Sequence, residues 1–130
     1  MVTDMSFTND LETRVLQWAL TNGSPTRPTA WYVGLFTAAP GEAGGGTEIS
    51  GSGYARQAVT FTVSGNLATN NAAIEWPTAT GSWGTITHVA VFDALTTGNM
   101  LVYATPTASK SISTGDVLRI PSGDLDVTLD

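Results

Sequence analysis

The sequence contains no cysteine and few charged residues. Without cysteine among its 130 residues, disulfides and thiolate metal sites are excluded. Charged residues make up 12% of the chain, roughly half the share of about 25% in average proteins. Eleven acidic residues against five basic ones give a net charge of −6. Because phosphate binding needs clustered lysine and arginine, and the basic residues here stand singly, we expect no nucleic-acid binding.

Long apolar runs are missing as well. No window approaches the roughly 18 apolar residues of a membrane span. The opening "MVTDMSFTND" has no basic segment followed by an apolar run, which a signal peptide would have. We therefore expect a chain that does not enter a membrane and carries no cleaved export signal.

A helix is predicted over residues 9–21. Thr8 and Asn9 are candidate N-caps, because Asn9 stands three residues before a glutamate, at capping-box spacing. An apolar stripe follows from Leu11 to Trp18, and the segment "TNGSPTRP" then prevents the helix from continuing. A helix of this length is marginal by itself, so it docks either on its own domain or on a neighbouring subunit.

After residue 30 the pattern is that of short strands. The segment "AWYVGLFT" is apolar on both faces, which predicts a central strand. Seven or so such segments, separated by Gly, Pro, Asn and Asp turns, predict a mostly β fold. We expect a single-domain antiparallel β-sandwich (jelly-roll-like) or barrel with one N-terminal α-helix. The expected parts of this domain, 1–130, are an N-terminal arm at about 1–8, the helix at 9–21, and a β-sandwich at 30–130 with a Gly-rich loop at 38–53. Other segments predicted as single strands include "YARQAVTFTV", "AAIEWP", "GTITHVAVFDA", "NMLVYATP", "GDVLRIP" and "GDLDVTLD".

The Gly-rich loop does not fit a phosphate-binding loop. Such a loop needs a lysine and a following helix, whereas a strand is expected next and Glu42 and Glu48 would repel phosphate. Two interpretations remain open. The loop is either a flexible surface segment or a contact loop that lies against a neighbouring chain, where glycine lets two backbones approach closely.

Candidate catalytic and metal-binding residues are few. His88 is the only histidine, and its place in an alternating segment favours a histidine packed in a sheet over a zinc ligand or a catalytic base. Four aspartates gather near the C-terminus, where turn or edge positions are favoured over a calcium site or a pair of catalytic carboxylates. These four are Asp116, Asp124, Asp126 and Asp130. We expect no catalytic residue, no metal and no cofactor.

The four tryptophans leave three roles open: core packing, an interface, or sugar binding. Trp83, flanked by small turn residues in "TGSWGT", is a candidate for either an interface or the core. The residues that we expect at a protein interface are Phe7, Trp18, Gly44, Gly45, Gly46, Thr47 and Trp83.

Three phrases carry a family resemblance: "GLFTAAP…GGGTE…GYARQAVTF", "WPTATGSWGTITHVAVFDA" and "TGDVLRIPSGDLDVTL". Together they resemble a widespread family of small virion proteins of tailed bacteriophages, whose members are described as head-decoration or cement proteins, tail-fibre proteins or minor tail proteins. The resemblance covers about residues 8–130. One departure is Trp76, where the family pattern has Phe.

The resemblance implies a non-enzymatic virion structural protein, made in the host cytoplasm. We expect a capsid decoration or cement protein on the capsid surface, bound to the major capsid protein and assembled as a homotrimer, because the chain shows neither a coiled coil nor a β-helix repeat. The alternative is a tail or tail-fibre component. On either expectation, the Gly-rich loop and the arm before Thr8 are candidates for contact with a neighbouring subunit.

Overall fold

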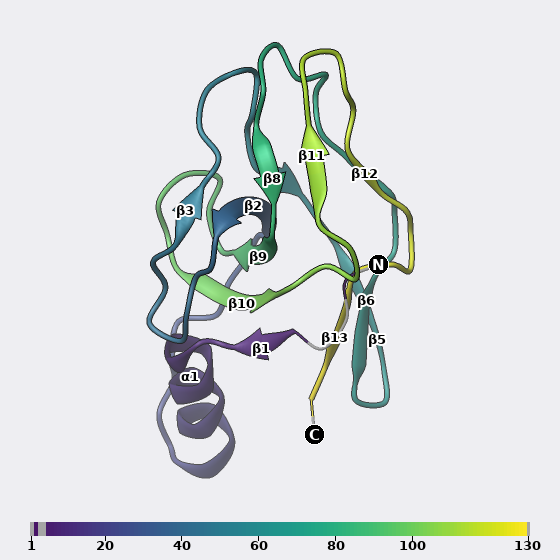
Figure 1. The fold of residues 1–130 in the computed structure, drawn as a ribbon. Coiled ribbons are helices and arrows are strands. Elements are labelled where there is room, and N and C mark those ends of the chain that lie inside the picture. Colours follow the sequence, from purple (N-terminus) through teal and green to yellow (C-terminus); the bar gives the residue numbers. More distant parts are fainter. Residues whose placement is uncertain (1, 3–4, 130) are drawn as a thin grey trace.

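The computed structural model of the chain describes residues 2 and 5–129. Within this described part, one helix lies beside a set of short antiparallel strands (Figure 1). The mostly β class is confirmed. The sheets do not close into a barrel, so the arrangement is consistent with a sandwich. The bounds are β1 Ser6–Phe7, α1 Asn9–Leu20, β2 Tyr32–Ala38, β3 Thr47–Glu48, β4 Gln57–Ala58, β5 Phe61–Ser64, β6 Leu67–Asn70, β7 Ile74–Glu75, β8 Gly84–Ile86, β9 His88–Phe92, β10 Met100–Ala104, β11 Lys110–Ile112, β12 Arg119–Ile120 and β13 Asp126–Thr128.

The principal sheet has the strand order β1-β10-β9-β2-β3, and β4 also pairs with β2. The central place predicted for the segment around β2 is confirmed. Val33 and Leu35 are fully buried on one face, and Phe36 is buried on the other. Within the sheet, β2 lies between β9 and the short strands β3 and β4. A strand with two apolar faces must be covered on both sides, and a cluster of buried side chains lies against each face of β2.

Two predicted single strands are divided between sheets. The segment "GTITHVAVFDA" breaks at Thr87, so that β8 pairs with β11 while β9 joins the principal sheet. The segment "YARQAVTFTV" breaks likewise into β4 and β5. Read as one strand, the first segment places Ile86 on the face of Ala90 and Phe92, whereas in the structure Ile86 packs in one cluster with Val89 and Val91. Neither break carries a Gly or Pro, so the sequence does not mark where the chain changes sheets. Four further strands were not expected: β1, β3, β6 and β11.

Two clusters of buried side chains cover the two faces of the principal sheet. The larger one includes Trp76 and Leu125 and continues through the smaller sheets. The smaller one consists of Phe36, Ala90, Phe92 and Met100, and it forms the floor of the groove described below.

The described residues of the N-terminal segment pack into the domain. Val2 is fully buried, and its backbone N–H donates to the carbonyl of Asp124 at 2.8 Å. Met5 is also in the core, and β1 pairs with β10. The described part of the expected arm is therefore a strand and core segment of its own domain. Residues 1, 3 and 4 of that arm lie outside the described part.

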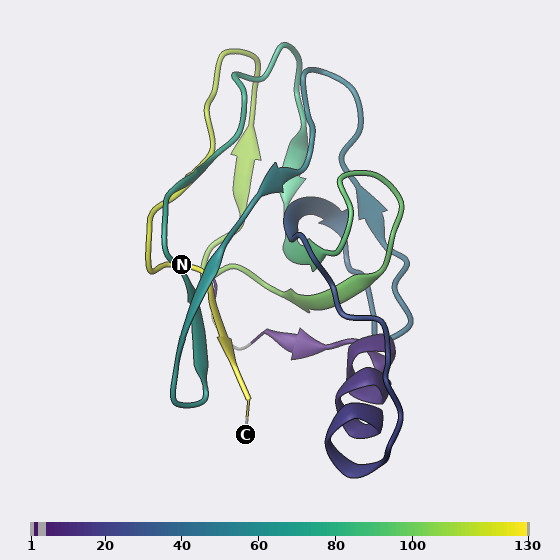
Figure 2. The same cartoon turned by 180° about the vertical axis from the view of Figure 1, so that it is seen from behind.

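The helix begins and ends nearly where the sequence predicts. Thr8 is the N-cap: its Oγ1 accepts from the Leu11 N–H at 3.4 Å and donates to the carbonyl of Met100 at 2.7 Å. The last helical residue is Leu20, one residue earlier than expected. The helix start packs against β1 and β10, whereas its far end projects from the body in both views (Figures 1 and 2). In the described chain, no helix has the length and apolar character that a membrane crossing requires.

Candidate functional site

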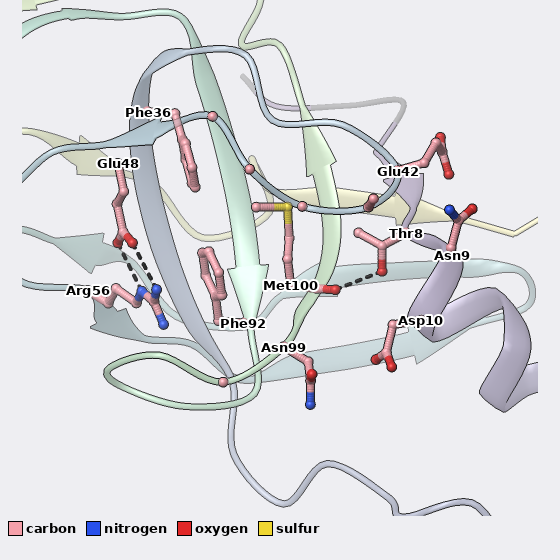
Figure 3. A pocket seen from close by; sticks show the side chains of 15 residues that line it. Thr8, Asn9, Asp10, Phe36, Glu42, Glu48, Arg56, Phe92, Asn99 and Met100 are labelled. Atoms are coloured by element: carbon pink, nitrogen blue, oxygen red, sulfur yellow. Dashed lines mark hydrogen bonds and ion pairs between the residues drawn. The ribbon is translucent and has the colours of Figure 1, made fainter.

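A groove of about 480 Å³ lies under the Gly-rich loop. Its lining comes from segments far apart in the chain: the start of α1, strand β2, residues 42–46, Glu48, Arg56, and the turn between β9 and β10. Figure 3 shows Glu48 and Arg56 along one side, and Glu42, Asn9 and Asp10 on the opposite side. The loop thus roofs a polar groove with an apolar floor.

The floor is aromatic and closely packed. The rings of Phe36 and Phe92 stack with centroids 6.1 Å apart. The Arg56 guanidinium carbon lies 3.5 Å from the centroid of Phe92, which is well within cation–π range. Because both phenylalanine side chains are almost fully buried, they offer little surface to a ligand.

Arg56 and Glu48 form the main ion pair of the site. Arg56 donates from Nε to Glu48 Oε2 at 2.9 Å and from Nη2 to Oε1 at 2.8 Å. Its Nη1 donates to the carbonyls of Ala94 and Thr97. This bidentate geometry is the strong form of a charge-assisted contact, and it fastens the end of the Gly-rich loop to the turn between β9 and β10.

Tyr54 completes this network. Its hydroxyl donates to Glu48 Oε2 at 2.7 Å and accepts from the Leu35 N–H at 2.9 Å. Burial and the hydrogen bond to Glu48 raise the pKa of Tyr54 far above its ordinary value. Gly34 makes the arrangement possible, because a Cβ there would stand 2.9 Å from both Glu48 and Phe92.

The opposite side of the groove is held by Glu42. The Asn9 N–H at the start of α1 donates to the Glu42 carbonyl at 2.9 Å, and the Tyr103 hydroxyl donates to Glu42 Oε1 at 2.8 Å. A hydrogen bond with Glu42 raises the pKa of the Glu12 carboxyl above its usual range. The loop thereby caps the helix start of its own chain.

The interface residues predicted from sequence lie in different surroundings. Gly44 and Gly45 border open space, and Thr47 is exposed in β3. Gly46 is enclosed by backbone. The three glycines form one edge of the groove, Thr47 follows them in the chain, and the expected contact of all four with another chain stays a prediction.

The other three predicted interface residues do not join that edge. Trp18 is 74% exposed on α1. Phe7 packs against the larger core cluster from β1. Trp83 is 5% exposed in that cluster, with its Nε1 donating to the Ser52 carbonyl at 2.9 Å. The core was one of the two places that the sequence left open for Trp83.

Two of the candidate catalytic residues, His88 and Asp116, make local contacts in the fold, and Asp130 lies outside the described residues. His88 is half-buried in β9, and its Nδ1 contacts Thr87 Oγ1 at 3.0 Å. Asp116 accepts the Ser113 N–H across a turn, in line with the turn position expected for it. Within the described residues, no group of three or more His, Cys, Asp or Glu side chains is placed to hold a metal.

The sequence did not indicate the network of Glu48, Tyr54 and Arg56. The available signal was an acid at the end of the Gly-rich loop followed, within one short segment, by a tyrosine and an arginine. In the sequence, Glu48 argues only against phosphate binding, and Arg56 is one of five basic residues that stand singly. Their pairing depends on β3 and β4 both lying against β2.

Fold and groove together define a small β-rich module in which polar side chains fasten a loop to its own domain. A comparison with family models gives the class. The model described as "Podophage GP4 fiber I protein gp80" matches residues 6–128. The chain belongs to this family of tailed-phage virion structural proteins. A search of curated proteins found no match.

Proposed function

We propose that the chain is a structural component of a phage tail fibre and acts through contact with other virion proteins. The observation that carries this proposal is the family match over residues 6–128, because the family description names a fibre protein. This favours the tail-fibre alternative over the capsid decoration protein that we expected first.

The shape of the loop supports a role in assembly. Glu48 and Glu42 anchor its two sides to the domain, while Gly44 and Gly45 between them border open space. A loop fastened in this way presents its backbone with little loss of entropy on binding. We propose that this outer edge, with exposed Thr47, contacts a neighbouring virion protein.

The location can be tested by counting copies. Particles would be purified, separated into capsids and tails, and analysed by quantitative mass spectrometry against the major capsid protein. A fibre component should remain with the tail fraction in a few copies per particle. Hundreds of copies in the capsid fraction would contradict the fibre proposal and support decoration of the capsid.

The loop contact can be tested in the same particles. Ala43 is exposed on the loop, and Thr114 is exposed in a distant turn. The substitution Ala43→Arg should reduce incorporation into particles, because it places a bulky charge on the proposed contact, whereas Thr114→Arg should not. Equal incorporation of the two folded variants would argue against the loop contact.

A further inference from the structure

The β5–β6 hairpin carries a strand edge that has no partner strand. In the sheet of order β13-β6-β5, β5 pairs with β6 alone, so its other edge is open in the described part of the chain. With four residues, β5 is the longest of the described strands that lie at a sheet edge. Figures 1 and 2 show the hairpin extending from the body on the side opposite α1.

The pairing with β6 fixes which backbone groups of β5 point outward. The Thr60 carbonyl accepts the Asn71 N–H at 3.1 Å, so these two residues form a hydrogen-bonded pair. Hydrogen-bonded and non-hydrogen-bonded pairs alternate along an antiparallel ladder, and the register of β5 and β6 has no shift. Phe61 and Val63 therefore turn their N–H and C=O groups away from β6, where these groups have no hydrogen-bond partner among the described residues.

The usual protections of a strand edge are missing at β5. Proteins guard such edges with charged side chains, proline, a bulge or a covering segment. The stretch between Arg56 and Glu75 contains neither a charged residue nor a proline, and β5 pairs with β6 without a bulge. Five other strands at sheet edges each contain one charged residue, namely β3, β7, β11, β12 and β13. The edge of β5 is therefore available for pairing with another strand.

The side chains of β5 suit a contact without charge. Phe61 packs against the larger core cluster, and Val63 on the same face is 69% exposed. Thr60, Thr62 and Ser64 alternate on the other face and are exposed. The strand thus has one apolar face and one polar, uncharged face, and both are rich in residues that favour strands.

We propose that β5 of one copy pairs antiparallel with β5 of a second copy, about a two-fold axis that passes through Thr62. The outward N–H and C=O groups of Phe61 then meet those of Val63 in the other copy, and the reverse contact follows by symmetry. Each Phe61 ring also lies beside the exposed Val63 of the other copy, which is a favourable aromatic–β-branched pair. The two β13-β6-β5 sheets thereby become one continuous sheet.

A second copy fits this edge because the edge is complementary to itself. An isologous contact requires one surface to match its own rotated copy, and the outward groups lie symmetrically on either side of Thr62. The net charge of −6 opposes self-association elsewhere on the surface, but β5 and β6 bring no charged side chain to the axis. The pairing is short, so it gains most where copies are held side by side at high effective concentration. This surface is separate from the Gly-rich loop, and the inference does not depend on the proposed function.

Cysteine trapping tests the pairing, because the chain has no cysteine of its own. Cα atoms of a non-hydrogen-bonded antiparallel pair stand about 4.5 Å apart, which a disulfide can span. Under mild oxidation, Thr62→Cys should form a disulfide-linked dimer at least about tenfold faster than Thr114→Cys, since pairing raises the effective concentration of the thiols. Thr114 is exposed in a distant turn. Equal rates for the two variants would overturn the proposal.

Two further cysteine positions test the register. In the proposed arrangement Thr60 lies opposite Ser64 of the other copy, so a mixture of Thr60→Cys and Ser64→Cys should form the mixed disulfide rapidly. Each variant alone should link as slowly as Thr114→Cys, because identical residues then stand about 13 Å apart, beyond the reach of a disulfide. Rapid linking of either variant alone would overturn the two-fold axis at Thr62.

A charged residue placed on the edge should abolish the pairing. In the Thr62→Cys chain, Val63→Lys should lower the linking rate to that of Thr114→Cys, whereas Val117→Lys, at a position 48% exposed outside the hairpin, should leave it unchanged. Circular dichroism checks that every variant is folded. If Val63→Lys prevents incorporation into particles although Thr62→Cys forms no dimer, the edge binds a strand of another virion protein, and the pairing of two copies is overturned. The proposed function would then still stand, since copy number and Ala43→Arg test it separately.

Discussion

At the scale of the residue, two buried polar side chains differ in whether their polar atoms form hydrogen bonds. Asn70 is 1% exposed and satisfied by four hydrogen bonds, with Nδ2 donating to two carbonyls and Oδ1 accepting two backbone N–H groups. It thereby ties the end of β6 to the turn before β13. Trp76 is equally buried, but its Nε1 has no hydrogen-bond partner, and an unpaired buried donor costs free energy.

Trp76→Phe should therefore cost little stability, because the loss of packing is offset by removal of the unpaired N–H. We expect a change within about 1 kcal/mol in the free energy of unfolding, measured by urea denaturation, against about 3–5 kcal/mol for Trp76→Ala. This agrees with the phenylalanine that the family pattern has at this place. If Trp76→Phe lowers the free energy of unfolding as much as Trp76→Ala does, the packing of the indole ring outweighs the cost of its unpaired N–H.

Arg56 should matter far more to stability than another paired arginine. Its side chain is 9% exposed and bound to Glu48 through two hydrogen bonds, whereas Arg119 is 56% exposed and stands 3.9 Å from Glu75. Arg56→Ala leaves the Glu48 carboxylate without its partner, so it should cost about 3 kcal/mol or more. Arg119→Ala should cost less than about 1 kcal/mol. Equal losses in denaturation experiments would contradict the anchoring role of Arg56.

Asp93 should make the protein sensitive to acid. Partial burial raises its pKa, but the hydrogen bonds that Asn99 donates and the charge of Arg14 outweigh this, so the pKa lies below its ordinary value. Because the folded state prefers the carboxylate, the stabilisation is present above about pH 4 and is lost as the pH falls through the folded pKa. Asp93→Asn should flatten the decline of unfolding free energy with acid. An unchanged decline would assign the acid sensitivity to other groups.

At the scale of the element, the Gly-rich loop combines an enclosed part with an open part. Gly44 and Gly46 both have positive φ, of 89° and 77°. A Cβ at Gly44 would meet nothing within 4 Å, but one at Gly46 would stand 2.7 Å from the Pro40 nitrogen and 2.8 Å from the Ala38 oxygen. Backbone conformation demands glycine at both positions, and close approach of the chain demands it only at Gly46.

Gly44→Ala and Gly46→Ala form a matched pair for this distinction. The first should cost about 1 kcal/mol through its backbone conformation. The second should cost on the order of 3 kcal/mol, since it adds a clash with backbone that cannot move aside. Thermal unfolding of the two variants measures the difference, and similar melting temperatures would mean that the loop relaxes around Gly46.

At the scale of the whole molecule, the N-terminal residue Val2 lies against the segment that leads into β13. Val2 accepts the Asp126 N–H at 2.9 Å and forms a parallel bridge with Leu125, while β1 forms the edge of the principal sheet. The N-terminal segment therefore joins the principal sheet to the sheet of β5, β6 and β13. Where it is described, the N-terminal arm contributes to the core of its own chain, and its expected contact with a neighbour stays a prediction.

Met5→Ala tests this contribution. Met5 is 4% exposed, so truncation should cost about 2–5 kcal/mol, measured by urea denaturation of the purified chain. An exposed apolar residue such as Val117, which is 48% exposed, supplies the control Val117→Ala with a loss of less than about 1 kcal/mol. A negligible effect of Met5→Ala would return the segment to the role of a loose arm.

The sequence by itself determined those features that depend on neighbours in the chain. The helix and its Thr8 cap, the central strand at β2 and the turn at Asp116 follow from local spacing, since caps, periodicity and turns act over a few residues. The mostly β class follows from the same local patterns, repeated along the chain.

Only the tertiary structure decided which strands share a sheet. No Gly or Pro marks the change of sheet at Thr87, and the strands paired with β8 and β9 come from distant parts of the sequence. The groove is a consequence of that pairing, because β3 and β4 must both meet β2 before Glu48, Tyr54 and Arg56 can come together. Contacts of this kind depend on positions in space, which local sequence patterns do not specify.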